Sequence, residues 1–460
     1  MEKKKRTKTT TQKFGQRSSG VPPAASFSDE NEMRDFIFRN YKETFSELIT
    51  GKKQNPMWKT STFPSVRFLI QHDAERRING ALDDLKSLFL DGREVRLEKA
   101  ADTTTRIDLL GHIVEGTGLT IIELKKSRQT ERQAFTELLA YANHFSMLFP
   151  GLGEHSVLSI LVAPMESRIV RDAYFQELVT NKKNVVALIP KIADDVFSLE
   201  VYYPDEQYYK WIENNVLDDQ AFVAFVASFP EIQGWIDTDR KNVGSPPDHS
   251  VKALNTIALL IAQKLEASGL HGMVYARQHW SELADALFSN PNSIVVSILN
   301  PFSSFRNDLR DGVVIGDTPQ GRISEIQAIV GQLIDDNDLW LENMQACFDD
   351  RIISIIQESF DISLRQVQQE SIQPEISCPD WAAFKNSMLE AATCYNLNLF
   401  TTGMIREIYH EYIKHIYKDG YDKIYYADDL PRFSYDTLHE FFAVWIILNG
   451  LSFREEEEAE

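Results

Sequence analysis

Two short apolar segments, residues 105–114 and 119–125, constrain the fold more than any other feature of the chain. Gly116-Thr117-Gly118 stands between them, and glycines at this position are typical of a β-hairpin turn. Residues 131–145 then carry apolar side chains at three- and four-residue steps, which predicts a helix. The continuous apolar run Val157–Ala163 predicts a strand buried on both faces. Together these segments predict a sheet covered by helices.

The register of the hairpin follows from the position of its turn. With the turn centred between residues 115 and 116, Asp108 faces Glu123 and Arg106 faces Lys125. Because side chains alternate between the two faces of a strand, these four lie on one face. A slip of one residue would break this arrangement.

Residues 61–205 are expected to form one α/β domain with a mixed sheet flanked by helices. The predicted order of elements is α-β-β-β-α-β-α-β-β, with Asp91-Gly92 ending the first helix. The predicted helices cover about 65–88, 131–145 and 168–179, and the predicted strands cover 94–98, 105–114, 119–125, 157–163, 184–189 and 196–203.

The flanking regions have a different character. Residues 1–28 predict a flexible basic tail, 29–60 a helical arm, and 451–460 an acidic tail. Residues 206–450 predict a mainly α-helical domain with a small β-α-β insert near 270–300. Its predicted helices cover 250–268, 322–349, 350–371, 380–396, 401–418 and 434–449.

The formal net charge of −20 is distributed unevenly along the 460 residues. Residues 1–205 carry a net charge of +2 and residues 206–460 carry −22. The first part can therefore approach a polyanion, whereas the second should repel one. Acidic surfaces also keep proteins soluble, so the charge of the second part has a plain alternative explanation.

Several sequence features indicate the cellular compartment of the protein. They are the three cysteines, the N-terminus and the longest apolar runs. The cysteines lack CxxC spacing, which argues against a disulfide framework and a cysteine zinc site and favours a reducing, cytoplasmic compartment. The basic N-terminus precedes no apolar stretch, so a secretory signal is not predicted. No apolar run reaches about 18 residues, and no membrane span is expected.

The paired carboxylates carry the chemistry. Asp108 and Glu123, opposed across a partly buried ladder, repel each other and lose solvation. A divalent cation would offset both costs, and oxygen ligands suit Mg²⁺ or Mn²⁺. Lys125 would then lie beside the cation and could orient or help deprotonate an attacking water. This layout predicts metal-assisted phosphodiester hydrolysis.

Arg106-Ile107-Asp108-Leu109-Leu110 and Ile121-Ile122-Glu123-Leu124-Lys125 resemble the motif of the PD-(D/E)XK nuclease superfamily. The resemblance covers roughly residues 62–205 and implies a restriction-endonuclease-like αβββαβ core. It implies a Mg²⁺-dependent nuclease, acting on DNA more often than RNA. It further implies Asp108, Glu123 and the Leu124 carbonyl as metal ligands and Lys125 as the water-positioning base. Ile107 stands where many members have proline.

Three further residues enter through the same resemblance. Many members carry an acidic residue on the first helix, where Glu75 would be a catalytic and metal-binding residue; a surface ion pair is the alternative. Gln133 and Tyr141 resemble a Gln/Tyr helix motif of the RecB-like branch, although their spacing is wider. Gln133 also fits a capping box beginning at Thr130, and Tyr141 fits a core position.

Basic residues follow the candidate site closely. Lys126, Arg128 and Arg132, together with Arg106, would contact phosphates beside the scissile bond; a solvated basic surface is the alternative.

Three functions remain open from the sequence. The first is a nuclease that acts in bacterial antiphage defence. Residues 206–450 would regulate it through a protein partner or through self-association. The others are a repair or recombination nuclease, and a non-catalytic subunit that keeps the fold.

Overall fold

The computed structural model describes residues 27–56, 66–97, 106–114, 118–150, 156–215, 222–229, 248–278, 290, 292–300, 302, 328–333, 337–366, 372–379, 395–408 and 410. The chain divides into two compact units. The first comprises residues 1–52, 81–174 and 184–202, and the second comprises 53–80, 175–183 and 203–460. None of the described helices is long and apolar enough to span a bilayer.

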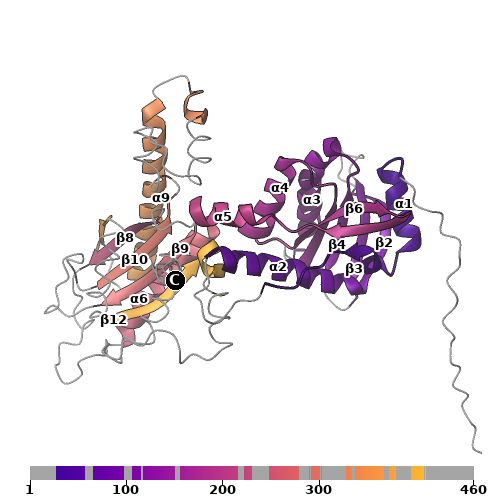
Figure 1. Ribbon diagram of the computed structural model, residues 1–460. Coiled ribbons are helices and arrows are strands. Elements are labelled where there is room, and N and C mark those ends of the chain that lie inside the picture. The colour runs from indigo at the N-terminus through magenta and orange to yellow at the C-terminus, as the bar shows by residue number, and fades with distance from the viewer. Residues whose placement is uncertain are drawn as a thin grey trace, which may run out of the picture. The chain divides into compact units, whose positions relative to one another are not determined.

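The first unit is built on a seven-stranded mixed sheet of order β1-β7-β6-β5-β4-β3-β2 (Figure 1). Three neighbouring pairs are parallel: β1 with β7, β4 with β5, and β5 with β6. The other three pairs are antiparallel. The strands are β1 (Ile49–Thr50), β2 (Leu88–Arg96), β3 (Arg106–Ile113), β4 (Leu119–Leu124), β5 (Val157–Val162), β6 (Val185–Ala193) and β7 (Val196–Val201).

Helices α1 (Glu30–Asn40) and α3 (Arg128–Leu148) pack on this sheet, α1 against β2 and β3 and α3 against β4 and β5. The arm predicted over 29–60 thus contains α1, followed by a 3₁₀ turn, Phe45–Leu48, and β1. Further helices are α2 (Val66–Asp84), a 3₁₀ turn (Leu85–Ser87), α4 (Arg168–Phe175) and a π-helical turn (Gln176–Thr180). The predicted order of helices and strands is confirmed, and the mixed sheet with flanking helices is observed.

The start of the sheet differs from the prediction. The first helix ends at Asp84, and β2 already begins at Leu88. Asp91-Gly92 lies at a bulge within β2, where the pairing with β3 shifts between Leu90 and Gly92. A bulge bends a strand without ending it, so the glycine marks an irregularity in the strand and not the helix end.

The second unit contains a five-stranded antiparallel sheet of order β11-β8-β10-β9-β12. The expectation of a mainly α-helical region missed this sheet, and the predicted insert supplies only β9 and β10. The strands are β8 (Phe222–Phe229), β9 (Gly272–Gln278), β10 (Asn292–Leu299), β11 (Glu375–Ser377) and β12 (Tyr395–Thr402).

Helices α6 (Asp248–Ala267) and α9 (Asn337–Gln366) form a core with this sheet through Ile257, Ile261, Ile356 and Phe360. The helix α5 (Glu206–Asn215) belongs to the same unit. The helix predicted over 250–268 is confirmed, whereas α9 runs across the predicted boundary between residues 349 and 350. The predicted helix over 434–449 and most of that over 380–396 lie outside the described residues, as do the tails 1–26 and 451–460.

Candidate active site

The predicted register of β3 and β4 is confirmed. Leu109 pairs with Ile122 and Leu110 with Ile121 in an antiparallel ladder. Continued by one residue, this register sets Asp108 opposite Glu123. A register shifted by one residue would move the side chains of β3, whose burial alternates along the strand, to the wrong face. The hairpin therefore brings the two predicted acids together.

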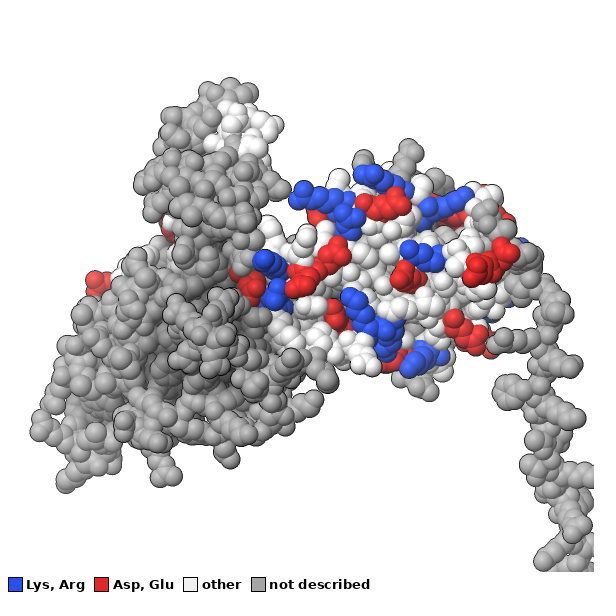
Figure 2. All heavy atoms as spheres, viewed as in Figure 1, with Lys and Arg blue, Asp and Glu red and all other residues white. Residues whose placement is uncertain are grey.

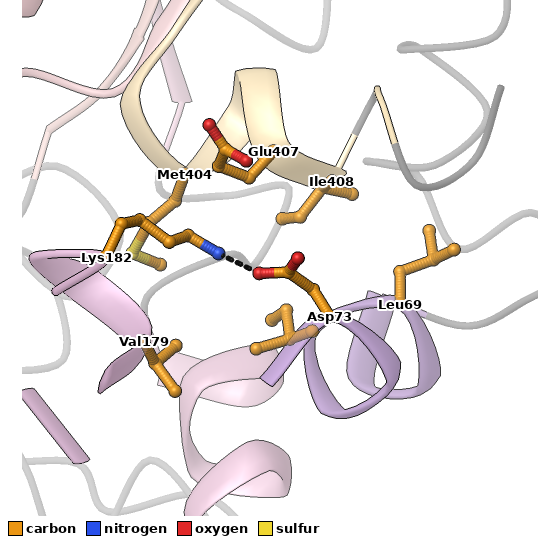
Figure 3. Close-up of a pocket in the computed structure, with 8 residues that line it drawn as sticks. Leu69, Asp73, Val179, Lys182, Met404, Glu407 and Ile408 are labelled. Carbon is orange, nitrogen blue, oxygen red and sulfur yellow. Dashed lines mark hydrogen bonds and ion pairs between the residues drawn. The ribbon is translucent and has the colours of Figure 1, made fainter. Parts of the chain in front are cut away.

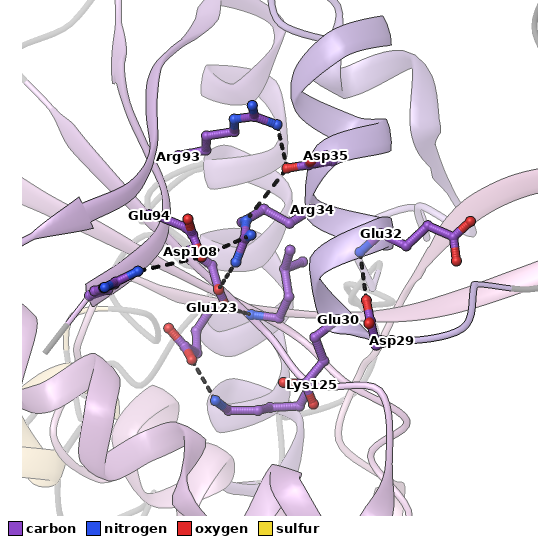
Figure 4. A network of polar contacts seen from close by, with 12 residues as sticks. Asp29, Glu30, Glu32, Arg34, Asp35, Arg93, Glu94, Asp108, Glu123 and Lys125 are labelled. Atoms are coloured by element: carbon purple, nitrogen blue, oxygen red, sulfur yellow. Dashed lines mark hydrogen bonds and ion pairs between the residues drawn. The ribbon is translucent and has the colours of Figure 1, made fainter. Parts of the chain in front are cut away.

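Asp108 is held at both carboxylate oxygens (Figure 4). Its Oδ2 accepts a hydrogen bond from the Leu124 N–H at 2.9 Å. Its Oδ1 lies 3.4 Å from Arg34 Nη1, which donates to it. Burial raises the pKa of Asp108 above its ordinary value, although the Leu124 hydrogen bond and the charges of Lys125 and Arg34 oppose this effect.

Glu123 is almost fully buried, with 4% of its side chain exposed. Its Oε1 accepts a hydrogen bond from Lys125 Nζ at 2.6 Å. Its Oε2 is buried and has no hydrogen-bond partner among the described residues. Burial, reinforced by the nearby charge of Asp108, raises the pKa of Glu123 to about 9. A positive charge next to Asp108 and Glu123 would therefore stabilise the ionised forms of both acids.

Lys125 lies directly after β4, where its backbone N–H donates to the Val162 carbonyl at 2.8 Å. Its ammonium is ion-paired with two carboxylates, with Nζ 2.6 Å from Glu123 Oε1 and 2.5 Å from Glu137 Oε2. Burial disfavours the charged ammonium, but the two carboxylates outweigh it and raise the pKa of Lys125. The structure therefore keeps this lysine protonated.

Three residues of this cluster were not predicted: Arg34 on α1, Glu94 on β2 and Glu137 on α3. Glu137 lies four residues from both Gln133 and Tyr141, so the helical repeat places all three on one face of α3. That spacing could have identified it. Arg34 carries no comparable signal, because its partner Asp108 lies 74 residues away.

Tyr141 is buried, as a core residue should be, and its hydroxyl donates to the Arg106 carbonyl at 2.8 Å. Burial and the carboxylates of Glu123 and Glu137 raise the pKa of Tyr141. The hydroxyl is therefore a hydrogen-bond donor that ties α3 to the end of β3.

Two further predicted residues, Gln133 and Glu75, lie on helices α3 and α2. Gln133 is exposed, and its predicted capping box is wrong because α3 already begins at Arg128, before Thr130. Glu75 is buried on α2, in the part assigned to the second unit, and accepts a hydrogen bond from Gln71 at 2.9 Å.

The predicted basic contacts lie around the exit of β4 and the start of β3. Lys126 and Arg128 are exposed, and Lys126 Nζ donates to the Ser28 carbonyl at 2.5 Å. Arg106 is exposed, 3.8 Å from Glu94. The side chain of Arg132 lies outside the described residues.

Asp108 and Glu123 offer carboxylate oxygens, the ligands that a divalent cation such as Mg²⁺ prefers. Within the described parts of the chain, no three or more His, Cys, Asp or Glu side chains are grouped to hold a metal ion. Mg²⁺ needs fewer, because it keeps several waters and is commonly held by one or two carboxylates. The buried, unbonded Glu123 Oε2 beside Asp108 is an oxygen that such an ion would satisfy. The residues present therefore fit Mg²⁺ or Mn²⁺.

Charges of both signs are interspersed over the visible face of the first unit (Figure 2). On this face, basic side chains stand next to acidic ones and form no continuous basic stripe among the described residues. Phosphate contacts would therefore depend on individual side chains near the site more than on a broad field.

A small pocket lies within the second unit (Figure 3). Its lining is mainly apolar, and its charged groups are already paired. Asp73 lies 2.5 Å from Lys182 and 2.7 Å from Arg76, and Glu407 lies 2.8 Å from Arg406. Because these carboxylates already have cationic partners, this pocket is a weaker candidate than the β3–β4 cluster.

Comparison of the chain with protein-family models, curated proteins and solved structures found no match.

Proposed function

We propose that this protein is a Mg²⁺- or Mn²⁺-dependent nuclease that hydrolyses phosphodiesters of nucleic acid, DNA in preference to RNA. The observation that carries the proposal is the antiparallel register that sets Asp108 against Glu123, with Lys125 bonded to Glu123. The resemblance of these residues to the PD-(D/E)XK motif supports the same function and a restriction-endonuclease-like core.

Asp108, Glu123 and the Leu124 carbonyl would hold the cation. When bound, it would polarise the phosphate and lower the pKa of a bound water. Because the Leu124 N–H bonds Asp108 Oδ2, the two strands fix the direction of that carboxylate. Burial of the acids keeps bulk water from competing with their ligand.

Lys125 acts in this proposal as a cation that stabilises negative charge on the phosphate. Its raised pKa favours this role over that of a proton acceptor. Glu137 on α3 is a second ion-pair partner of the ammonium and thereby helps to orient it. A preorganised charge of this kind can contribute a large share of a rate enhancement.

The test is incubation of the full chain with plasmid, linear DNA and RNA, with and without Mg²⁺ or Mn²⁺. The wild type should cleave only with the cation, and Asp108→Ala should reduce cleavage to background. Asp83→Ala, which removes an exposed carboxylate of the same unit, is the matched control and should retain activity. Cleavage by Asp108→Ala equal to that of the wild type would refute the proposal.

The proposal also covers the compartment, the partners and the biological role of the protein. The cysteine composition supports a reducing, cytoplasmic compartment, and Cys347 and Cys378 are free thiols. Residues 206–460, with their net charge of −22, would contact a protein partner or a second copy more readily than nucleic acid. A role in antiphage defence rests on the habits of the resembled superfamily alone.

A further inference from the structure

Arg34 is a buried cation outside the residues that carry the nuclease motif. It lies on α1, whose N-terminus is capped by Asp29 through a 2.8 Å hydrogen bond from the Glu32 N–H. Only 6% of Arg34 is exposed. A buried guanidinium needs paired partners, because its desolvation is costly.

Those partners are acids on three different elements (Figure 4). Nη1 donates to Asp108 Oδ1 at 3.4 Å, and Nη2 lies 3.1 Å from Glu94 Oε1. Nε lies 3.8 Å from Asp35 Oδ1. The two ends of the guanidinium fork thus bridge Asp108 on β3 and Glu94 on β2. Since the fork is buried and engaged with protein acids, Arg34 is placed to act on Asp108 and not on a substrate.

Glu94 and Asp35 are themselves held in place. Glu94 Oε1 also lies 3.8 Å from Arg106 Nη1, so a second cation, from β3, contacts this carboxylate. Asp35 is ion-paired with Arg93 from β2 and lies 3.4 Å from Arg39. The partners of Arg34 are therefore fixed from β2 as well as from α1.

The N-terminus of α1 is also bonded to the segment that leaves the catalytic strand. Glu30 Oε1 accepts a hydrogen bond from the Lys126 N–H at 3.0 Å. The Ser28 carbonyl accepts one from Lys126 Nζ. Lys126 is the residue after Lys125, so α1 is attached to both strands of the candidate site.

We propose that Arg34 is a positioning residue of the active site, which fixes the Asp108 carboxylate for the divalent cation. Arg34 holds Oδ1 while the Leu124 N–H holds Oδ2, and the carboxylate cannot rotate away from Glu123. This inference rests on the proposed function. It makes α1 part of the catalytic machinery, although α1 lies outside residues 62–205.

If Arg34 instead competed with the cation, its removal would change metal affinity in the opposite direction. A guanidinium that merely takes the place of the cation would compete with it, and its removal would tighten metal binding. A guanidinium that orients a ligand supports the cation, and loss of such an outer partner typically weakens metal affinity or activity about 10–100-fold. The direction of the change in affinity therefore decides between the two roles.

The experiment measures Mn²⁺ binding to the metal-free full chain by calorimetry, and the Mn²⁺ concentration that half-saturates cleavage. Arg34→Gln should raise both about 10–100-fold. Arg39→Gln is the matched control, since Arg39 lies on the same helix and contacts the same Asp35 from an exposed position. It should change neither value by more than about twofold. Arg34→Lys should restore little, because one ammonium cannot reproduce the two-ended fork.

Glu94→Gln provides a second variant if Arg34→Gln folds poorly. Glu94 is about half exposed, and neutralising it loosens the far end of the guanidinium without emptying a buried site. It should shift Mn²⁺ affinity in the same direction by a smaller factor. Unchanged or tighter Mn²⁺ binding in folded Arg34→Gln or Glu94→Gln, with the wild type still cleaving, would overturn the inference alone. A wild type that neither binds Mn²⁺ nor cleaves would overturn the proposed function, and the inference with it.

Discussion

Replacing Glu123 by glutamine should stabilise the metal-free protein while it abolishes cleavage. Glu123 is buried beside Asp108, and its pKa is raised to about 9 from an ordinary value of 4.5. At neutral pH the folded protein must therefore keep a proton that the unfolded chain releases. Glutamine resembles the protonated carboxyl group in shape but needs no proton, so it removes this cost.

The size of the effect follows from proton linkage. Between pH 4.5 and pH 7, at about 1.4 kcal/mol per pH unit, holding the proton costs about 3 kcal/mol. The amide recovers hydrogen bonds less well than the carboxyl, at a cost of about 1 kcal/mol. The net gain is about 2 kcal/mol, which corresponds to a rise in Tm of roughly 4–8 °C for a domain of this size.

The pH dependence has a definite sign. Because the folded-state pKa lies above the unfolded value, the contribution of Glu123 to stability is fully present below pH 4.5. It is lost as pH rises toward 9. The advantage of Glu123→Gln over the wild type should therefore be absent near pH 4.5, grow through neutral pH and level off near pH 9.

The assay is differential scanning calorimetry in the presence of a chelator. Tryptophan fluorescence would not report on the unfolding of the first unit, because all seven tryptophans lie in the second unit. Glu43→Gln, at an exposed position of the first unit, is the control and should change stability by less than about 0.5 kcal/mol. Saturating Mg²⁺, at about a hundred times its Kd, should add about 2.7 kcal/mol to the wild type and nothing to Glu123→Gln. Equal or lower stability of Glu123→Gln at pH 8 would refute the burial argument.

Three further outcomes are expected. Lys125→Met should lower the rate of cleavage at saturating substrate about a hundredfold or more, because it removes a fixed charge beside the phosphate; Lys86→Met, at an exposed site, should leave the rate unchanged. Arg128→Ala should weaken DNA binding and reduce the slope of log affinity against log salt by about 1, measured by anisotropy; an unchanged slope would exclude a phosphate contact. The apparent Mn²⁺ affinity should increase up to about tenfold per pH unit between pH 6 and 8, because Glu123 must release a proton to bind the ion; calorimetry showing a flat profile would contradict its raised pKa.

The β3–β4 hairpin is the part of the site that the sequence determined. The turn centred between residues 115 and 116 predicts the register, and the observed pairs Leu109–Ile122 and Leu110–Ile121 follow it. That register carries Asp108 and Glu123 to the same place without any knowledge of the rest of the fold. The continuous apolar run of β5 likewise predicted its central place in the sheet.

The second unit shows where local patterns failed. Phe222–Phe229 forms the buried strand β8 and is apolar except at Ser228, although the surrounding spacing predicts a mainly helical region. Tyr395–Thr402 spans the predicted end of one helix and start of another, but it pairs with β9, more than a hundred residues earlier in the chain. Strand pairing at that separation leaves no trace in a short window of sequence, and tertiary packing overrides local preference.

Tertiary structure alone decided the surroundings of the paired acids. Arg34 on α1 contacts Asp108, Glu137 on α3 contacts Lys125, and Glu94 on β2 contacts the other end of Arg34, because elements distant in sequence pack on one sheet. The buried state of Glu123 Oε2, and with it the raised pKa, depends on that same packing. A sequence fixes which side chains share a strand face through the two-residue period of β structure. Which charges then meet across the fold is set by the burial of whole elements, which no local spacing encodes.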